Sequence, residues 1–116
     1  MANPLHEYTV QEGQNLSSYS SYKQANVTIN ETSIGSGDES VDWTGTPAKE
    51  VTITKVSGDD ANTVSLQLKI AGTYGATITY LLSEFPITID KLHVDQIRFS
   101  TSDSGTDEVV KLLSFH

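Results

Sequence analysis

The chain has no cysteine among its 116 residues. This absence excludes disulfide bonds, thiolate nucleophiles and every zinc or iron–sulfur site that uses cysteine ligands. A chain of this length buries roughly two thirds of the surface that its unfolded form exposes, so it can hold a core without such cross-links. We therefore expect one domain that is stabilised by side-chain packing.

Basic residues are also scarce, since seven Lys and Arg stand against 15 Asp and Glu, for a formal net charge of −8. Affinity for nucleic acid comes mainly from clustered Lys and Arg that neutralise phosphates, so this charge predicts no nucleic-acid partner. The amino terminus has neither a basic opening nor a continuous apolar stretch, and apolar runs elsewhere are only a few residues long. We expect no secretory signal, no membrane segment and no membrane partner.

Apolar residues in the second half recur at every second position in short blocks. The clearest block is residues 62–70, where Val64, Leu66, Leu68 and Ile70 alternate with polar residues. This period is typical of a strand with one buried face and one solvent-exposed face. No stretch holds helical spacing for long, which argues against an α/β fold. The other expected strands are residues 49–56, 76–82, 87–92, 94–100 and 108–115.

Turn residues separate these blocks, because glycine and aspartate are the residues that short hairpins need. Residues 49–82 are therefore predicted to form a three-stranded meander and residues 94–115 a hairpin. Pro86 has no amide donor, so we place it at the start of a strand or on an edge. In the last strand, the apolar residues expected to face the core are Val109, Leu113 and Phe115. The predicted turns are residues 57–60, 72–75 and 102–106.

The first half is richer in polar residues and glycine. We predict that residues 1–24 form an N-terminal arm and that residues 25–116 form the folded domain. Within the domain, residues 25–30 are expected to add a strand and residues 33–47 a long loop. Residues 7–10 and 41–43 are weaker strand candidates. The predicted fold is all-β, an antiparallel β-sandwich or jelly roll of about eight short strands.

One short motif suggests catalysis. Asp103-Ser104-Gly105 matches the triplet of aspartic proteases, in which two such carboxylates share a proton across an interface. In that family most of the fold follows the triplet, whereas only eleven residues follow Gly105 here. Because the same residue types favour turns, we interpret the triplet as a turn. We predict no catalytic residue and expect that the protein is not an enzyme.

Two acidic groups, residues 38–42 and residues 59–60, could offer oxygen ligands to calcium. Neither has the spacing of a known calcium loop, so solvated acidic loops are the preferred interpretation. The histidines at positions 6, 93 and 116 are isolated and form no metal-binding pair in the sequence. We therefore expect no metal and no cofactor.

Four large aromatic residues lie in polar, loop-like surroundings. Such side chains serve as anchors at protein interfaces or as stacking platforms for sugar rings. Large aromatic side chains can also cover a hydrophobic core. For Trp43 we favour this interpretation, because it alternates with Val41. The candidate interface residues are Tyr8, Tyr19, Tyr22 and Trp43.

The second half also has a characteristic order of strands and turns. The relevant segments are Val51-Thr-Ile-Thr-Lys-Val-Ser, Ser57-Gly-Asp-Asp-Ala-Asn-Thr, Val64-Ser-Leu-Gln-Leu, Tyr80-Leu-Leu, Ile87-Thr-Ile-Asp-Lys and Ile97-Arg-Phe-Ser-Thr-Ser-Asp-Ser-Gly. In this order, residues 51–116 resemble small all-β accessory proteins of bacteriophage virions. The resemblance implies an oligomeric protein without catalysis, at the capsid as a decoration protein or at the neck or tail.

The leading hypothesis is therefore a non-enzymatic virion structural protein, most simply a capsid decoration or cement protein. Its expected location is the virion, and its expected partners are itself, as a homo-oligomer with a trimer as one option, and the major capsid protein or another virion protein. The arm would pair with the sheet edge of a neighbour, and repeated contacts on a lattice would strengthen binding. The alternative is a carbohydrate-binding or adhesin-like β-sandwich module with Trp43 and nearby tyrosines as its platform.

Overall fold

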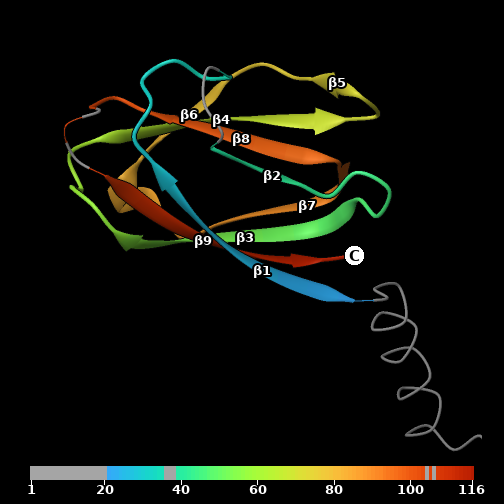
Figure 1. Ribbon diagram of the computed structural model, residues 1–116. Coiled ribbons are helices and arrows are strands. Elements are labelled where there is room, and N and C mark those ends of the chain that lie inside the picture. The colour runs from blue at the N-terminus through green and yellow to red at the C-terminus, as the bar shows by residue number, and fades with distance from the viewer. Residues whose placement is uncertain (1–20, 36–38, 104, 106) are drawn as a thin grey trace, which may run out of the picture.

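The computed structural model describes residues 21–35, 39–103, 105 and 107–116. The described chain forms antiparallel strands and one short 3-10 helix (Figure 1). None of its helices is long and apolar enough to cross a membrane. The elements are β1 (Tyr22–Ile29), β2 (Ser40–Asp42), β3 (Ala48–Ser57), β4 (Thr63–Ile70), β5 (Thr73–Tyr74), β6 (Ile78–Leu81), η1 (Leu82–Glu84), β7 (Ile87–Val94), β8 (Gln96–Thr101) and β9 (Glu108–Phe115).

Two sheets pack face to face in this structure (Figure 1). The first sheet has the strand order β1-β9-β3-β7. The second has the order β2-β8-β4-β5, and β6 also pairs with β4. Because β8 occupies one side of β4, the short strands β5 and β6 lie one after the other along its second side. The all-β sandwich predicted from the sequence is therefore confirmed.

The strand pairing is nested along the chain. β1 pairs with β9, β2 with β8, β3 with β7, and β4 with β5 and β6. If β5 and β6 are taken as one interrupted strand, the chain is an eight-stranded antiparallel ribbon rolled into two sheets. This arrangement is the jelly roll, the more specific of the two predicted architectures.

The core lies between the sheets and follows the predicted alternation closely. Val51 and Ile53 of β3 are buried in the same core cluster as Val64 and Leu66 of β4. Each such side chain contributes about 1.5–3 kcal/mol when it is fully removed from water. Further along β4, Leu68 is only half-buried, although it still packs against the core. Apolar burial thus fixes which face of each strand turns inward.

Two predicted hairpins are wrong, because the chain changes sheets there. The turn at residues 57–60 leads from β3 in the first sheet to β4 in the second, so residues 49–82 form no meander. Residues 102–106 likewise lead from β8 to β9 in the opposite sheet. The hairpin that does form joins β4 to β5 through Ala71 and Gly72, whose φ angles are 52° and 82°. Positive φ at both positions is the type I′ turn, whose twist suits a hairpin.

The predicted face of β9 is also wrong. The core-facing apolar residues are Val110 and Leu112, whereas Val109, Leu113 and Phe115 lie half-buried on the outer face. Both faces of this strand carry apolar residues, so alternation alone does not select one. The buried face includes two polar residues, Glu108 and Ser114.

Strand β1 confirms the strand expected at residues 25–30 and begins three residues earlier. Tyr22, Lys23 and Gln24, which the sequence assigned to the arm, pair with β9. Residues 1–20, which include the weak strand candidate at residues 7–10, lie outside the described residues. The other weak candidate corresponds to β2, and Pro86 immediately precedes the edge strand β7 as expected.

Candidate functional site

The structure separates the candidate interface residues. Tyr22 stands at the start of β1 with 66% of its surface exposed. Trp43 is only 5% exposed, and its ring meets the ring of His116 edge-on at 5.7 Å between centroids. The core interpretation of Trp43 is therefore confirmed, and a stacking platform built on this residue is wrong. Tyr8 and Tyr19 lie outside the described residues.

A serine–histidine pair, which the sequence analysis missed, lies beside Trp43. The carbonyl oxygen of Thr46 can only accept a hydrogen bond, so Nδ1 of His116 donates to it at 2.6 Å. Nε2 lies 2.8 Å from the Ser114 hydroxyl oxygen. That hydroxyl also lies within donating distance of the Lys23 carbonyl oxygen, at 3.4 Å. Such a pair can activate a nucleophile, but both side chains are only 1% exposed, so a substrate cannot reach them. The Ser-x-His spacing, which puts both residues on one strand face, is the signal that could have shown the pair.

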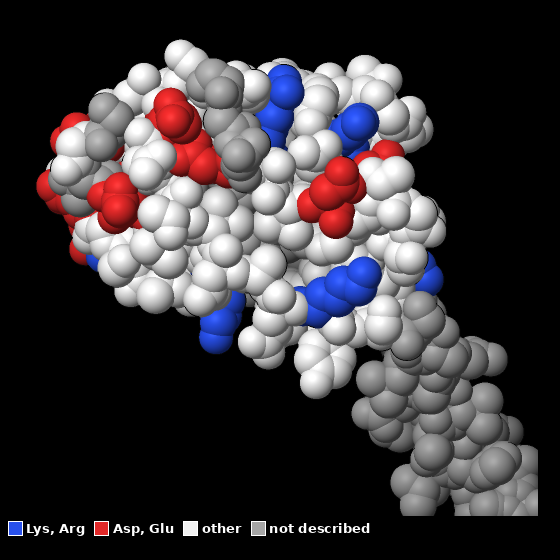
Figure 2. All heavy atoms as spheres, viewed as in Figure 1, with Lys and Arg blue, Asp and Glu red and all other residues white. Residues whose placement is uncertain are grey.

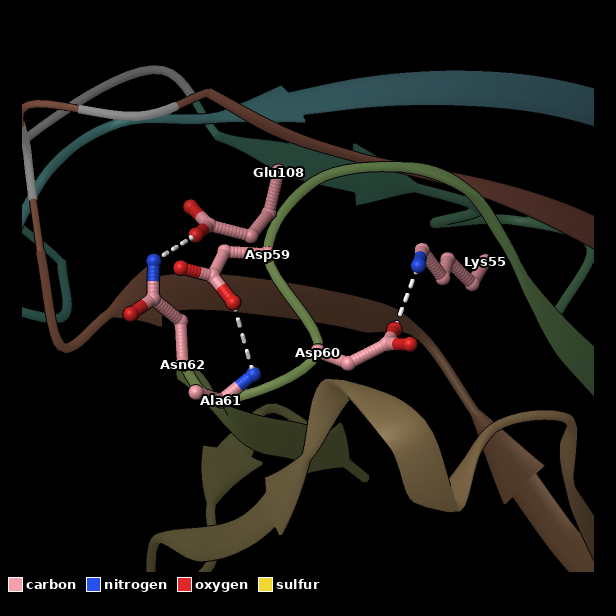
Figure 3. A network of polar contacts seen from close by, with 6 residues as sticks. All are labelled: Lys55, Asp59, Asp60, Ala61, Asn62 and Glu108. Carbon is pink, nitrogen blue, oxygen red and sulfur yellow. Dashed lines mark hydrogen bonds and ion pairs between the residues drawn. The ribbon is translucent and has the colours of Figure 1, made fainter.

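The acids of the β3–β4 connection stabilise their own loop (Figure 3). A carboxylate oxygen of Asp59 accepts a hydrogen bond from the Ala61 amide at 2.9 Å, and Asp60 forms an ion pair with Lys55. Within the described part of the chain, no group of three or more His, Asp or Glu side chains is arranged to hold a metal ion. The solvated-loop interpretation of Asp59 and Asp60 accounts for all of these contacts.

The other acidic group also makes local contacts, although Oε2 of Glu39 is buried without a hydrogen-bond partner. Asp42 accepts hydrogen bonds from the hydroxyl and the amide of Thr44, at 2.5 and 2.8 Å. These two bonds, the hydroxyl first, hold the pKa of Asp42 below its ordinary value of 3.8. Glu39 accepts from the amides of Asn30 and Glu31 at 2.5 and 3.0 Å, which fixes the chain where β1 ends. Asp38 lies outside the described residues.

One carboxyl group is buried at the start of β9. Glu108 has no exposed surface, and its Oε1 accepts a hydrogen bond from Nδ2 of Asn62 at 2.5 Å (Figure 3). Its Oε2 is buried without a hydrogen-bond partner. Gly58 lies against this side chain, because a Cβ added there would stand 3.0 Å from Cγ of Glu108. The buried Glu108 side chain therefore has no surface of its own to offer to a ligand.

Acidic residues gather at this same end of the sandwich, which lies on the left in Figure 2. The β1–β2, β3–β4 and β8–β9 connections meet there through backbone bonds, such as those from Thr101 to Glu31 and from Ser102 to Thr63. We call this region the acidic end and define it by Glu31, Glu39, Asp59, Asp60, Asp103 and Asp107. Since Ile29 ends β1 at this position, the carboxyl end of β1 points toward negative charge. Asp103 also accepts from the Gly105 amide at 2.8 Å, which supports the turn interpretation of that triplet; Ser104 lies outside the described residues.

Four strand edges bound the two sheets in the described part of the chain, and three of them are irregular or short. β2 has three residues, and the edge opposite it is divided between the two residues of β5 and the four of β6. β7 follows Pro86 and contains a bulge. Ala48 pairs with Val94 and Glu50 pairs with Asp90, so two residues of β3 are matched by four residues of β7. Lys91, inside this bulge, has a φ of 63°. Short strands, bulges, proline and lysine are the features that prevent a sheet edge from pairing with another chain.

The fourth edge, β1, is neither short nor bulged. Its eight residues match eight residues of β9 in one unbroken register. It contains no proline or glycine, and Lys23 is its single charged residue. On this edge a further strand could add by backbone pairing. A hollow of about 320 Å³ runs beside it, lined by Asn26, Thr28, Glu39 and Ser40 among others.

The backbone groups offered by this edge can be identified from one residue pair. Ser21 and His116 exchange both backbone hydrogen bonds, at 3.3 and 2.8 Å. In an antiparallel ladder such pairs alternate, so every second residue from Ser21 faces β9 and the residues between them face outward. The outward backbone groups of β1 therefore belong to Tyr22, Gln24, Asn26 and Thr28, whose side chains are all exposed.

No protein-family model and no curated protein matches the sequence. The geometry of the β1 edge is therefore the main basis for a functional proposal.

Proposed function

We propose that this protein is a non-enzymatic structural protein of a bacteriophage virion, a capsid decoration or cement protein that binds the viral shell and other copies of itself. One observation carries the proposal. β1 is a regular, eight-residue open edge, whereas each of the other three described edges is short, divided or bulged. An edge left regular in this way is suited to backbone pairing with another protein.

Assembly on a shell suits such a contact. A single added strand is a small interface and gives modest affinity on its own. Many identical contacts on a symmetric lattice raise the effective affinity without any new kind of interaction. The resemblance of residues 51–116 to virion accessory proteins supports the same role. The jelly roll by itself does not select a function, because capsid proteins, lectins and enzymes share it.

A co-sedimentation experiment tests the proposal. Shells of the encoding phage that lack this protein are mixed with the purified chain and pelleted. Asn26→Pro removes an outward amide of β1, which the β1–β9 ladder does not use, and should abolish binding. Asn26→Ser is the matched control, because it keeps the backbone amide and should bind like the original protein. Equal binding of the proline variant would contradict the proposal.

Two further measurements concern the arm and the alternative function. The predicted arm is residues 1–24, and its last three residues belong to β1. Deletion of residues 1–20 removes the rest of the arm and leaves β1 complete, and the proposal expects it to abolish assembly on shells while the sandwich stays folded. A glycan array should give no hits, whereas specific hits would favour the carbohydrate-binding alternative. Capsid or tail genes beside the encoding gene are expected as well.

A further inference from the structure

We infer that the β1 edge takes β1 of a second copy of this chain, in antiparallel orientation, so that two copies share one continuous sheet across a two-fold axis. This inference rests on the proposed function, because it names the occupant of the same edge. It replaces the trimer as the expected oligomer, since a pair related by a two-fold axis closes at two copies.

The backbone of β1 is self-complementary in this orientation. The backbone groups of β1 that point away from β9 belong to even-numbered residues. If the two-fold axis passes through a residue of the strand, each even-numbered residue lies opposite an even-numbered residue of the second copy. With the centre at Asn26, Gln24 of each copy lies opposite Thr28 of the other. With the centre at Ala25, Gln24 lies opposite Asn26. Either register pairs most of the open edge within regular strand.

The side chains of the new pairs are compatible. The outer-face side chains of β1 are those of Tyr22, Gln24, Asn26 and Thr28, and none of them is charged. Like charges directly opposite each other would destabilise a strand pair, and this edge presents none. Threonine and tyrosine are also residues that favour sheet surfaces.

The charge distribution selects the antiparallel orientation. Lys23, the single charge of β1, lies at the opposite end of the strand from Ile29 and the acidic end. Antiparallel pairing brings Lys23 of each copy toward the acidic end of the other, where Glu31 is exposed. It also separates the two acidic ends by about the length of an eight-residue strand, roughly 27 Å. This separation exceeds the Debye length of about 8 Å at physiological salt, so their repulsion is screened.

The test uses the full-length chain and combines sedimentation velocity over a concentration series with amide hydrogen exchange by NMR. We expect a reversible monomer–dimer equilibrium. As dimer forms, the amides of Gln24, Asn26 and Thr28 should exchange at least about tenfold more slowly, whereas those of Ala25 and Val27, already bonded to β9, should change little. Asn26→Lys places equal charges near the two-fold axis and should raise the dimer dissociation constant roughly tenfold or more.

Control variants separate this edge from other contacts. Leu92→Lys adds the same charge at the bulged edge of the same sheet and should leave the dimer unchanged. Lys23→Glu should weaken the dimer, and the double variant Lys23→Glu/Glu31→Lys should restore it. Circular dichroism of each variant checks that the fold is intact.

Several results would overturn the inference. In sedimentation, these are a chain that stays monomeric at all concentrations or forms a trimer. In hydrogen exchange, they are a dimer whose β1 amides exchange no more slowly, or protection of the Gln24, Asn26 and Thr28 amides that is the same at every concentration. The last result would mean that the chain covers its own edge. Loss of shell binding by Asn26→Pro in a protein that never dimerises would refute the inference and leave the proposed function standing. A dimer of this kind that does not bind shells would contradict the proposed function and leave the inference standing.

Discussion

Gly58 lies where the chain leaves β3 and crosses to the opposite sheet, and its replacement by alanine should destabilise the fold strongly. Its φ is +131°, a backbone conformation that costs residues with a side chain roughly 1–3 kcal/mol. An added Cβ would stand 2.8 Å from Cδ2 of Leu82, 3.0 Å from Cγ of Glu108 and 3.1 Å from Cα of Glu108. The leucine methyl can rotate away, but the backbone atom cannot. Overpacking of this kind adds about 1–3 kcal/mol, so the total loss is expected to be about 2–6 kcal/mol.

Gly72→Ala is the matched control for this prediction. Gly72 also has a positive φ, +82°, but nothing lies within 4 Å of its added Cβ. Its substitution should therefore cost only the backbone strain, about 1–2 kcal/mol. Urea unfolding can be followed by the fluorescence of Trp43, the single tryptophan of the chain, which is buried in the native state. If Gly58→Ala cost no more than Gly72→Ala, close packing under the crossing would be the wrong explanation.

Three further predictions concern polar contacts. Thr44→Val removes the hydroxyl that is the main cause of the lowered pKa of Asp42, so an NMR titration should show that pKa rising toward 3.8. Because the folded-state pKa is depressed, the contribution of Asp42 to stability is present above pH 3.8 and lost as pH falls through the lowered value, and this loss should shrink in the variant. Asn62→Ala leaves both oxygens of buried Glu108 without a side-chain partner and should lower the free energy of unfolding by about 2–3 kcal/mol in urea. His116→Ala removes a buried ring and its two hydrogen bonds, and a loss of about 2–4 kcal/mol should appear as a lower midpoint in thermal unfolding; an unchanged midpoint would show that the C-terminal contact does not stabilise the sandwich.

The strands themselves could be predicted from the sequence, because alternation is a local property. Val51, Ile53, Val64 and Leu66 turn inward as their spacing requires. The face of β9 could not be predicted in this way, since apolar residues occupy both of its faces. There the inward face is set by the register in which β9 pairs with β1 and β3, strands that are distant in sequence.

The pairing of strands depends on contacts between residues distant in sequence more than the formation of each strand does. The residues at positions 57–60 have turn chemistry whether the next strand pairs beside β3 or crosses to the other sheet. The edge position of β1 follows from pairs such as Tyr22 with Phe115, more than ninety positions apart in the chain. Composition drew attention to Tyr22 as an aromatic residue in polar surroundings. Only the three-dimensional pairing shows that its backbone, and that of every second residue after it, faces outward.

The contrast between the two edges of the first sheet also bears on function. In β7 a non-glycine residue, Lys91, adopts a φ of 63°, a conformation that costs roughly 1–2 kcal/mol and interrupts the edge. The same sheet keeps β1 regular, although a regular edge exposes unpaired backbone groups to any neighbouring strand. The net charge of −8 opposes unselective association, and the acidic end beyond β1 penalises arrangements that bring two such ends together. Antiparallel contact along β1 avoids that penalty. The edge can therefore pair with another strand, but charge repulsion limits the orientations in which two copies can meet, as a specific assembly contact requires.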